Sequence, residues 1–325
     1  ATGNLVTARR HQEGLRHLGH EALLTGTAAD DPGLLRQALR ETRPDLVHLL
    51  HAFRCGRPWL ACRAEQPLPY VVTLTGTDIH HDLHQPGRGV VVREVLAGAA
   101  AIISQNRLTC VELERTHPEW GSRLRYLPPG IVLGTAPFPL RRRYAIPADR
   151  LLFFHPAGIR PVKGNLELLE HFDRVAALRS DFLALFSGPV LDEAYAGRFF
   201  AAVAARPWAL YLDVIPPTAM ASALREVDIV LNHSSSEGMP NALLEAAALG
   251  RPMLVRDIPG NAAVVTGGVN GLLYGSDEEF VATALRLLDD PALRRTLANP
   301  APGRYSPELE SRALAAVYRE ALQRS

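Results

Sequence analysis

The chain has 325 residues, which suggests about two domains, and 47% of them are hydrophobic, enough for two large cores. Its 35 Lys and Arg residues nearly balance 34 Asp and Glu residues, so a net charge of +1 does not favour a nucleic-acid surface or a polybasic membrane surface. Three cysteines form no disulfide or metal-ligand pattern, and no apolar run is long enough to span a bilayer. We therefore expect a cytoplasmic protein that binds no nucleic acid, with peripheral membrane contact left open.

The first half of the chain alternates apolar runs with amphipathic segments, a pattern typical of parallel α/β units. Strands are expected at residues 21–26, 45–51, 70–76 and 100–106, and helices at 4–19, 32–42 and 90–99. The nearly unbroken apolar runs indicate strands that are covered on both faces. The chain begins directly before a helical pattern, where an α/β domain normally has a strand, so we expect the first strand to be missing from this sequence.

Residues 134–150 interrupt the pattern with prolines and charges and are expected to link two domains. A second α/β series follows. Its strands are expected at 151–158, 181–189, 208–215, 228–234 and 251–258, and its helices at 165–178, 194–206, 217–227, from 241, at 277–290 and at 307–323. Two such domains with parallel sheets leave a cleft at the carboxyl ends of their strands, where α/β proteins bind ligands.

The stretch SSSEGMPNALLEAAALGRP (residues 234–252) combines two glutamates with a predicted helix start near Asn241. The free N–H groups of a helix start bind anions, and Glu245 lies one turn further on the same face, about 5–6 Å along the axis. Glu237 precedes the helix. An anion between two hydroxyl-bearing groups describes a nucleotide sugar, with one carboxylate on the sugar and the other on the ribose. The alternative is a capped amphipathic helix whose Glu245 is solvated, although its apolar neighbours weaken this reading.

The loop GIRPVKGN, between a predicted strand and a predicted helix, contains Gly158, Arg160 and Lys163. Arg can engage phosphate oxygens in bidentate fashion and Lys acts as a point charge, so the pair suits a diphosphate that is bound without metal. The alternative is two exposed loop cations. No D-x-D element stands at a strand end, so we expect no divalent metal and no cofactor besides the nucleotide-sugar co-substrate.

The run EGMPNALLEAAALGRPMLVRDIPGNAAVV, with GVNGLLY after it, resembles the retaining glycosyltransferases of family 4 (glycosyl transferases group 1). The combination of GTD, SSSEGM and RDIPGNAAVV is most similar to the glycosyltransferase 1 domain-containing proteins, and TGTD also resembles the selenosugar synthases. The resemblance implies the GT-B architecture, two Rossmann-like domains with parallel sheets that face each other across a cleft. It also implies a metal-independent, retaining transfer from a nucleoside-diphosphate sugar, with UDP the most frequent carrier.

The resemblance also implies roles in the second half. Glu237 would contact the transferred sugar and Glu245 the donor ribose, while Arg160 and Lys163 would bind the diphosphate and neutralise the leaving group. The other residues implied to contact the donor are Gly158, Gly188, Ile215, Gly238, Met239, Pro240 and Asn241.

In the first half, family members often have a His in the "T.HG.D" motif where this chain has Thr75, so the protein must do without it or use a neighbour such as His80. Asp78 is the candidate for orienting the sugar or the acceptor, and its alternative is an Asx-turn cap. For His51 two interpretations remain: it faces the cleft, or it has a structural role in packing. The positions implied on the acceptor side are Gly3, Asn4, His51, Thr75, Gly76 and His80.

The predicted domains are an acceptor domain at 1–140, a donor domain at 150–304 and a C-terminal helix at 305–325 that packs back on the first domain. Three alternatives stand beside a glycosyltransferase: a nucleotide-sugar binding protein without turnover, a selenosugar-synthase-like transferase, and a dinucleotide-dependent oxidoreductase. The last is disfavoured because no G-x-G-x-x-G follows a first strand. The acceptor, the sugar, the base and the oligomeric state stay open.

Overall fold

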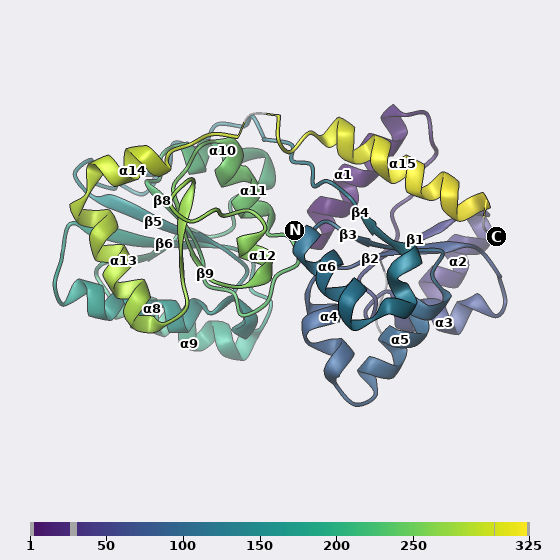
Figure 1. Cartoon of the computed structure of the whole chain (residues 1–325). Coiled ribbons are helices and arrows are strands. Elements are labelled where there is room, and N and C mark those ends of the chain that lie inside the picture. Colours follow the sequence, from purple (N-terminus) through teal and green to yellow (C-terminus); the bar gives the residue numbers. More distant parts are fainter. Residues whose placement is uncertain (1–2, 27–30, 302, 324–325) are drawn as a thin grey trace. The chain divides into compact units, whose positions relative to one another are not determined.

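The computed structural model describes residues 3–26, 31–301 and 303–323 (Figure 1). Contacts between residues divide the chain into two compact units. Unit 1 consists mainly of Ile131–Ser236 and Pro240–Tyr305, and unit 2 of Asn4–Gly130 and Ser306–Ser325 with the short segment Glu237–Met239. Each unit contains one parallel sheet with helices packed around it.

Unit 2 contains four parallel strands in the order β1-β2-β3-β4. They are β1 (Val47–Leu50), β2 (Tyr70–Thr73), β3 (Ala101–Ser104) and β4 (Leu124–Tyr126). Its helices are α1 (Gly3–His17), α2 (Gly33–Thr42), α3 (Gly56–Arg63), α4 (Thr77–His80), α5 (Arg88–Gly98), α6 (Arg107–Thr116) and α15 (Pro307–Gln323), with 3₁₀ turns η1 (Asp82–His84) and η2 (Pro118–Arg123). Every residue of β2 and β3 is buried, as expected for parallel strands covered on both faces.

The last helix, α15, supplies part of the core of unit 2. Leu314 and Val317 of α15 pack in one cluster with Val71, Ile103 and Leu127 of the sheet side. Glu310, also on α15, is fully buried and accepts hydrogen bonds from Arg10 (Nε to Oε2, 2.6 Å) and from Gln105. A buried carboxylate is tolerated because these donors replace its water.

Unit 1 contains six parallel strands in the order β10-β9-β8-β5-β6-β7. They are β5 (Leu151–Pro156), β6 (Phe182–Ser187), β7 (Ala209–Tyr211), β8 (Ile229–Asn232), β9 (Met253–Arg256) and β10 (Gly271–Tyr274). Its helices are α7 (Leu140–Arg143), α8 (Asn165–Ala176), α9 (Glu193–Ala204), α10 (Pro217–Arg225), α11 (Asn241–Ala248), α12 (Pro259–Ala262), α13 (Asp277–Asp289) and α14 (Pro291–Leu297), with the 3₁₀ turn η3 (Pro161–Lys163). The core is aromatic, with Phe153, Phe172 and Phe182 in mutual ring contact.

Two of the predicted segments differ in the structure, and the strands β4 and β10 were not among the predicted strands. Residues 21–26 do not form the predicted strand, because they pair with none of the described strands, and Leu23 and Leu24 are exposed. Residues 134–150, predicted as a linker, belong to unit 1. Phe138 and Leu140 are buried there, and Phe138 N donates to Ser222 Oγ of α10 at 2.9 Å. Apolar side chains within this proline-rich segment therefore anchor it to one unit.

Within the ranges that the structure describes, no helix combines the length and the apolar character that crossing a membrane requires.

Candidate active site

Four loops of unit 1 lie at one edge of its sheet. The strands β8, β5, β6 and β7 are neighbours and parallel, so their carboxyl ends share an edge, the usual ligand position in α/β proteins. The serine loop (residues 233–236) follows β8, and the basic loop (residues 157–164) follows β5. The turns at 188–191 and 212–216 follow β6 and β7. The predicted donor residues Gly158, Arg160, Lys163, Gly188 and Ile215 all fall in these loops.

The basic loop is a tight turn that presents its two cations three residues apart. Lys163 N donates to Arg160 O at 3.0 Å and Gly164 N to Pro161 O at 2.9 Å. Gly164 has φ +64°, a left-handed conformation that glycine adopts without strain, and α8 starts directly after it. Arg160 N donates to Asn165 Oδ1 at 3.3 Å, which joins the start of the loop to the first residue of α8.

Lys163 is the only lysine among the 325 residues. Every other long basic side chain is an arginine, so this position has a compact ammonium group in a chain that otherwise uses the planar guanidinium. This count is a signal in the sequence that favours a specific role for Lys163.

Neighbouring loops hold the basic loop on two sides. Ser235 N of the serine loop donates to Val162 O at 3.0 Å. On the other side, Ile159 N donates to Pro189 O at 2.8 Å. A Cβ at Gly188 would lie 2.2 Å from Ala157 O, so only glycine permits this approach between the two loops.

The turn after β7 depends on Ser187, which the sequence analysis did not single out. Its Oγ donates to Asp213 O at 2.6 Å and accepts from Ile215 N at 3.2 Å. Asp213 has φ +58° and Ile215 is buried. The hydroxyl therefore fixes the main chain at Ile215, and a serine at the last position of a buried strand is the signal that points to it.

Helix α11 begins at Asn241, with Pro240 at its N-cap and no side-chain capping bond. Glu245 is only 8% exposed and lies among buried Leu243, Leu244 and Ala246. The alternative of a solvated Glu245 is therefore wrong, and its burial demands polar partners. Glu237, Gly238 and Met239 are half-buried in the loop before this helix.

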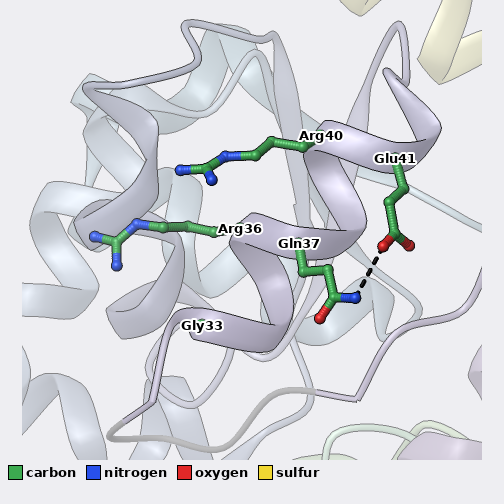
Figure 2. A pocket seen from close by; sticks show the side chains of 5 residues that line it. All are labelled: Gly33, Arg36, Gln37, Arg40 and Glu41. Carbon is green, nitrogen blue, oxygen red and sulfur yellow. Dashed lines mark hydrogen bonds between the residues drawn. The ribbon is translucent and has the colours of Figure 1, made fainter.

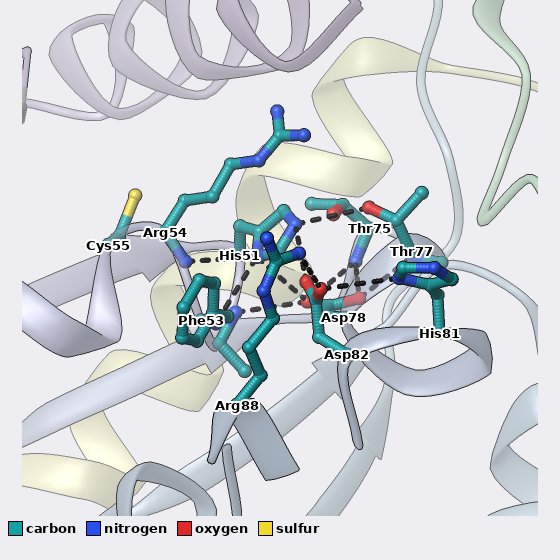
Figure 3. A network of polar contacts seen from close by, with 12 residues as sticks. His51, Phe53, Arg54, Cys55, Thr75, Thr77, Asp78, His81, Asp82 and Arg88 are labelled. Atoms are coloured by element: carbon teal, nitrogen blue, oxygen red, sulfur yellow. Dashed lines mark hydrogen bonds and ion pairs between the residues drawn. The ribbon is translucent and has the colours of Figure 1, made fainter. Parts of the chain in front are cut away.

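In unit 2, Asp78 joins the loops that follow β1 and β2 (Figure 3). Its side chain is fully buried and accepts from the backbone N–H groups of Ala52 (3.0 Å), Thr75 (3.0 Å) and Gly76 (2.9 Å). These hydrogen bonds correspond to the alternative given above, in which Asp78 caps the backbone of a turn. The carboxylate acts on the loop backbone in this structure, and a contact with a sugar or acceptor stays a prediction.

His51 lies beside Asp78 and is 1% exposed (Figure 3). Its Nδ1 accepts from Phe53 N and Arg54 N, both at 3.2 Å, so its proton is on Nε2, which lies 3.1 Å from Thr77 Oγ1. Its φ is +106°, a strained conformation for a non-glycine residue. Backbone strain of this kind clusters at functional sites, although no sequence pattern predicts it.

The other acceptor-side residues divide into two groups. Thr75 and His80 are half-buried, and Thr75 Oγ1 and His80 Nε2 have no hydrogen-bond partner among the described residues. Gly3 and Asn4, which the resemblance predicts in a loop, lie instead in the first turn of α1. Asp82 and Arg88, which the sequence analysis did not single out, form an ion pair at 2.9 Å next to His51.

A hollow on α2 contains none of the predicted site residues (Figure 2). Arg36 and Gln37 line it together with Gly33, Arg40 and Glu41. Arg36 donates to Glu65 at 2.9 Å and Gln37 to Glu41 at 2.8 Å, so two of its polar side chains bond to their neighbours. We do not assign the active site to this hollow.

Comparison with known protein families identifies one part of the chain. Residues 149–290 match the family model described as Glycosyl transferases group 1. This part of the chain is a glycosyl transferases group 1 domain. The predicted likeness to glycosyl transferases group 1 and the predicted enzyme class are confirmed, so the protein is a glycosyltransferase, while membership of family 4 and retention stay predictions.

Two curated relatives are similar in sequence to this glycosyltransferase over most of its length. It is 26% identical over 308 residues to Glycosyltransferase 1 domain-containing protein 1 of Xenopus tropicalis, across 92% of this chain and 88% of the relative. It is 26% identical over 261 residues to the D-inositol 3-phosphate glycosyltransferase of Acidothermus cellulolyticus. That alignment spans 74% of this chain and 58% of the relative.

Solved structures resemble the fold of the glycosyltransferase. Anabaena HepE, in a complex with UDP and glucose, has a TM-score of 0.73 and 17% identity over 90% of this chain and 84% of its own. Sucrose-phosphate synthase from Thermosynechococcus elongatus has a TM-score of 0.76 and 19% identity. The match covers 90% of this chain and 78% of the synthase chain. The predicted α/β fold with two parallel-sheet domains of the GT-B type is confirmed.

Proposed function

We propose that this glycosyltransferase takes its sugar from a nucleoside diphosphate without a metal, retains the anomeric configuration, and uses UDP as the carrier. The observation that carries the proposal is the basic loop. Arg160 and Lys163 lie in a tight turn at the ligand edge of the sheet, and hydrogen bonds from neighbouring loops hold the backbone of that turn. Preorganised cations of this kind stabilise charge that develops on a leaving diphosphate.

Two buried polar atoms beside the basic loop support a ligand there. Asn165 Nδ2 and Ser236 Oγ are buried, and neither has a hydrogen-bond partner among the described residues. Buried polar atoms normally have a partner, and a bound ligand or water supplies one where the protein does not. The proposal that UDP is the carrier has a further support, because the similar structure of Anabaena HepE is a complex with UDP and glucose.

The proposed reaction exchanges one bond at the sugar. The bond from the anomeric carbon to the diphosphate oxygen breaks, and a bond to the acceptor oxygen forms on the same face, which retains the configuration. The acceptor proton passes to the departing phosphate oxygen, so no strong protein base is needed. Lys163, Arg160 and the amide groups at the start of α11 stabilise the diphosphate as it leaves. Glu237 contacts the sugar, and Glu245 contacts the ribose.

A panel of UDP-, GDP- and ADP-sugars tests the donor, with EDTA present throughout. A donor at 100 times its Kd stabilises the folded state by about 2.7 kcal/mol, which raises the melting temperature. We expect the UDP-sugars to give the largest shift, and we expect Lys163→Ala to remove it. Transfer or slow donor hydrolysis, followed by NMR at the anomeric proton, distinguishes an enzyme from a protein that only binds.

The matched control is Arg295→Ala, because Arg295 is exposed on α14. A shift that needs added metal would reject the metal-free mechanism. An inverted product would reject retention. No shift with any of the donors would reject the nucleotide-sugar proposal.

A further inference from the structure

We propose that His233 and Tyr274 form a positioning pair for the basic loop: the imidazole packs against Gly164 and so fixes the position of Lys163. The inference rests on the proposed function, because Lys163 matters only if it meets the diphosphate. Neither residue belongs to the sequence-predicted site, and both are in unit 1.

The pair joins two strands of the sheet. His233 directly follows β8 and is 5% exposed, while Tyr274 ends β10 and is 3% exposed. His233 Nδ1 lies 2.5 Å from the Tyr274 hydroxyl, and the rings are stacked with centroids 5.9 Å apart and planes inclined by 14°. Since β9 lies between these strands, the hydrogen bond fixes the orientation of the imidazole from outside its own loop.

The imidazole in turn limits where the basic loop can lie. A Cβ at Gly164 would be 2.4 Å from His233 Cδ2 and 3.0 Å from His233 O. The backbone of Gly164 therefore lies directly on the ring. This contact is independent of the positive φ of Gly164, which by itself already disfavours any other residue there.

Three consecutive residues of the basic loop are held in this way. Val162 O accepts from Ser235 N, and Lys163 O lies 3.2 Å from Nε2 of the fully buried His155. Gly164 packs on His233. The backbone of Lys163 is thus held directly and through both of its neighbours, so its side chain starts from a fixed point.

The hydrogen bond of the pair stays uncharged at ordinary pH. Burial, together with the positive charge that His171, His155 and Arg256 can carry, lowers the pKa of His233 to about 3. Burial raises the pKa of Tyr274 far above its usual range. The ring is therefore held by a hydrogen bond between two neutral groups.

The test removes that one bond. Tyr274→Phe keeps the ring and deletes the hydroxyl, and we expect it to weaken the binding of UDP, measured by calorimetry, on the order of tenfold. The matched control is Tyr70→Phe, which also deletes the hydrogen bond of a buried tyrosine hydroxyl, from Tyr70 to Val95 O at 2.7 Å in unit 2, away from the donor loops. We expect the control to bind UDP within about twofold of the wild type, a change in affinity of under 0.5 kcal/mol.

A double-mutant cycle separates positioning from a general loss of stability. If Tyr274 acts through Lys163, then Tyr274→Phe has no further effect on UDP affinity in the Lys163→Ala background. Because Lys163 is the only lysine, acylation by an amine-reactive reagent with peptide mapping also reports on this side chain alone. We expect Tyr274→Phe, but not Tyr70→Phe, to change the acylation rate of Lys163 in the absence of UDP.

Each outcome decides a different question. If Tyr274→Phe binds UDP like the wild type while Lys163→Ala does not, the positioning pair is rejected and the proposed function stands. If the two substitutions are additive, or the acylation rate is unchanged, Tyr274 does not act through Lys163. If the wild type binds neither UDP, GDP nor ADP, the proposed function and this inference both fail.

Discussion

At the scale of single residues, the candidate donor site of unit 1 contains two cations of one loop and a buried carboxylate. Arg160 and Lys163 lie in one turn, as their spacing suggests, and Glu245 is buried. Asp78 shows the limit of the sequence, because an Asp two residues after a glycine fits both a substrate contact and a backbone cap. Three amide groups from two different loops occupy its carboxylate in the structure.

The lone lysine gives a prediction at this scale. Lys163→Arg keeps the charge but replaces a compact ammonium group by a larger, planar guanidinium group. The substitution therefore changes the geometry of the contact with the diphosphate. We expect the kcat/KM for transfer to fall about tenfold or more, a loss of about 1.4 kcal/mol of transition-state stabilisation. Arg295→Lys, an exposed exchange on α14, serves as the control. Wild-type kcat/KM in Lys163→Arg would show that charge alone suffices.

At the scale of elements, strands inside the sheets could be predicted from their apolar runs. A short apolar run alone, such as residues 21–26, did not predict a strand correctly. The buried strands β2, β3 and β8 agree with apolar runs, because a strand covered on both faces needs apolar side chains throughout. Residues 21–26 have the same local pattern but form no strand. A strand also needs a neighbour for its N–H and C=O groups, and local sequence does not supply one.

The docking of α15 gives a prediction at this scale. Glu310→Gln leaves Arg10 buried without its counter-ion, and breaking a buried pair in this way costs about 3–5 kcal/mol. Glu320→Gln on the same helix is the matched control. Its pair with Arg125 is partly exposed, at 2.9 Å, and such pairs contribute about 0–1 kcal/mol. Urea unfolding followed by circular dichroism measures both, and equal effects would contradict the anchoring role of Glu310.

At the scale of the whole molecule, the chain runs from unit 2 into unit 1 after Gly130 and returns to unit 2 after Tyr305. The family model covers residues 149–290, which belong to unit 1 apart from the short segment Glu237–Met239. The C-terminal helix nevertheless belongs to the core of unit 2, where it packs on β2 and β3. The stability of unit 2 therefore depends on residues at both ends of the chain.

This dependence predicts how stability changes with pH. Burial by itself raises the pKa of Glu310, but hydrogen bonds from His11 and Arg10 and the charge of Arg10 outweigh it and lower the pKa from 4.5 to about 2. The folded-state pKa is below the unfolded value, so the contribution is complete above pH 4.5 and is lost as the pH falls towards about 2. The loss amounts to about 3 kcal/mol.

Unfolding free energies measured by urea titration at several pH values test this prediction. We expect the wild type to lose stability between pH 4.5 and 2 more steeply than Glu310→Gln, which has no proton to bind at this position. Parallel pH profiles for the two proteins would contradict it.

The sequence by itself determined the α/β class, the order of most strands and helices, the family, and the loops that carry the candidate site. These depend on periodicity and on motifs within short stretches of chain. Only the tertiary structure decided the cap at Asp78, the burial of Glu245, the His233–Tyr274 pair and the ion pair between Arg10 and Glu310. The members of that ion pair are 300 positions apart, and those of the His233–Tyr274 pair are 41 apart. Such contacts form only when the packed core brings distant segments together, and no local pattern encodes which partner a side chain will find there.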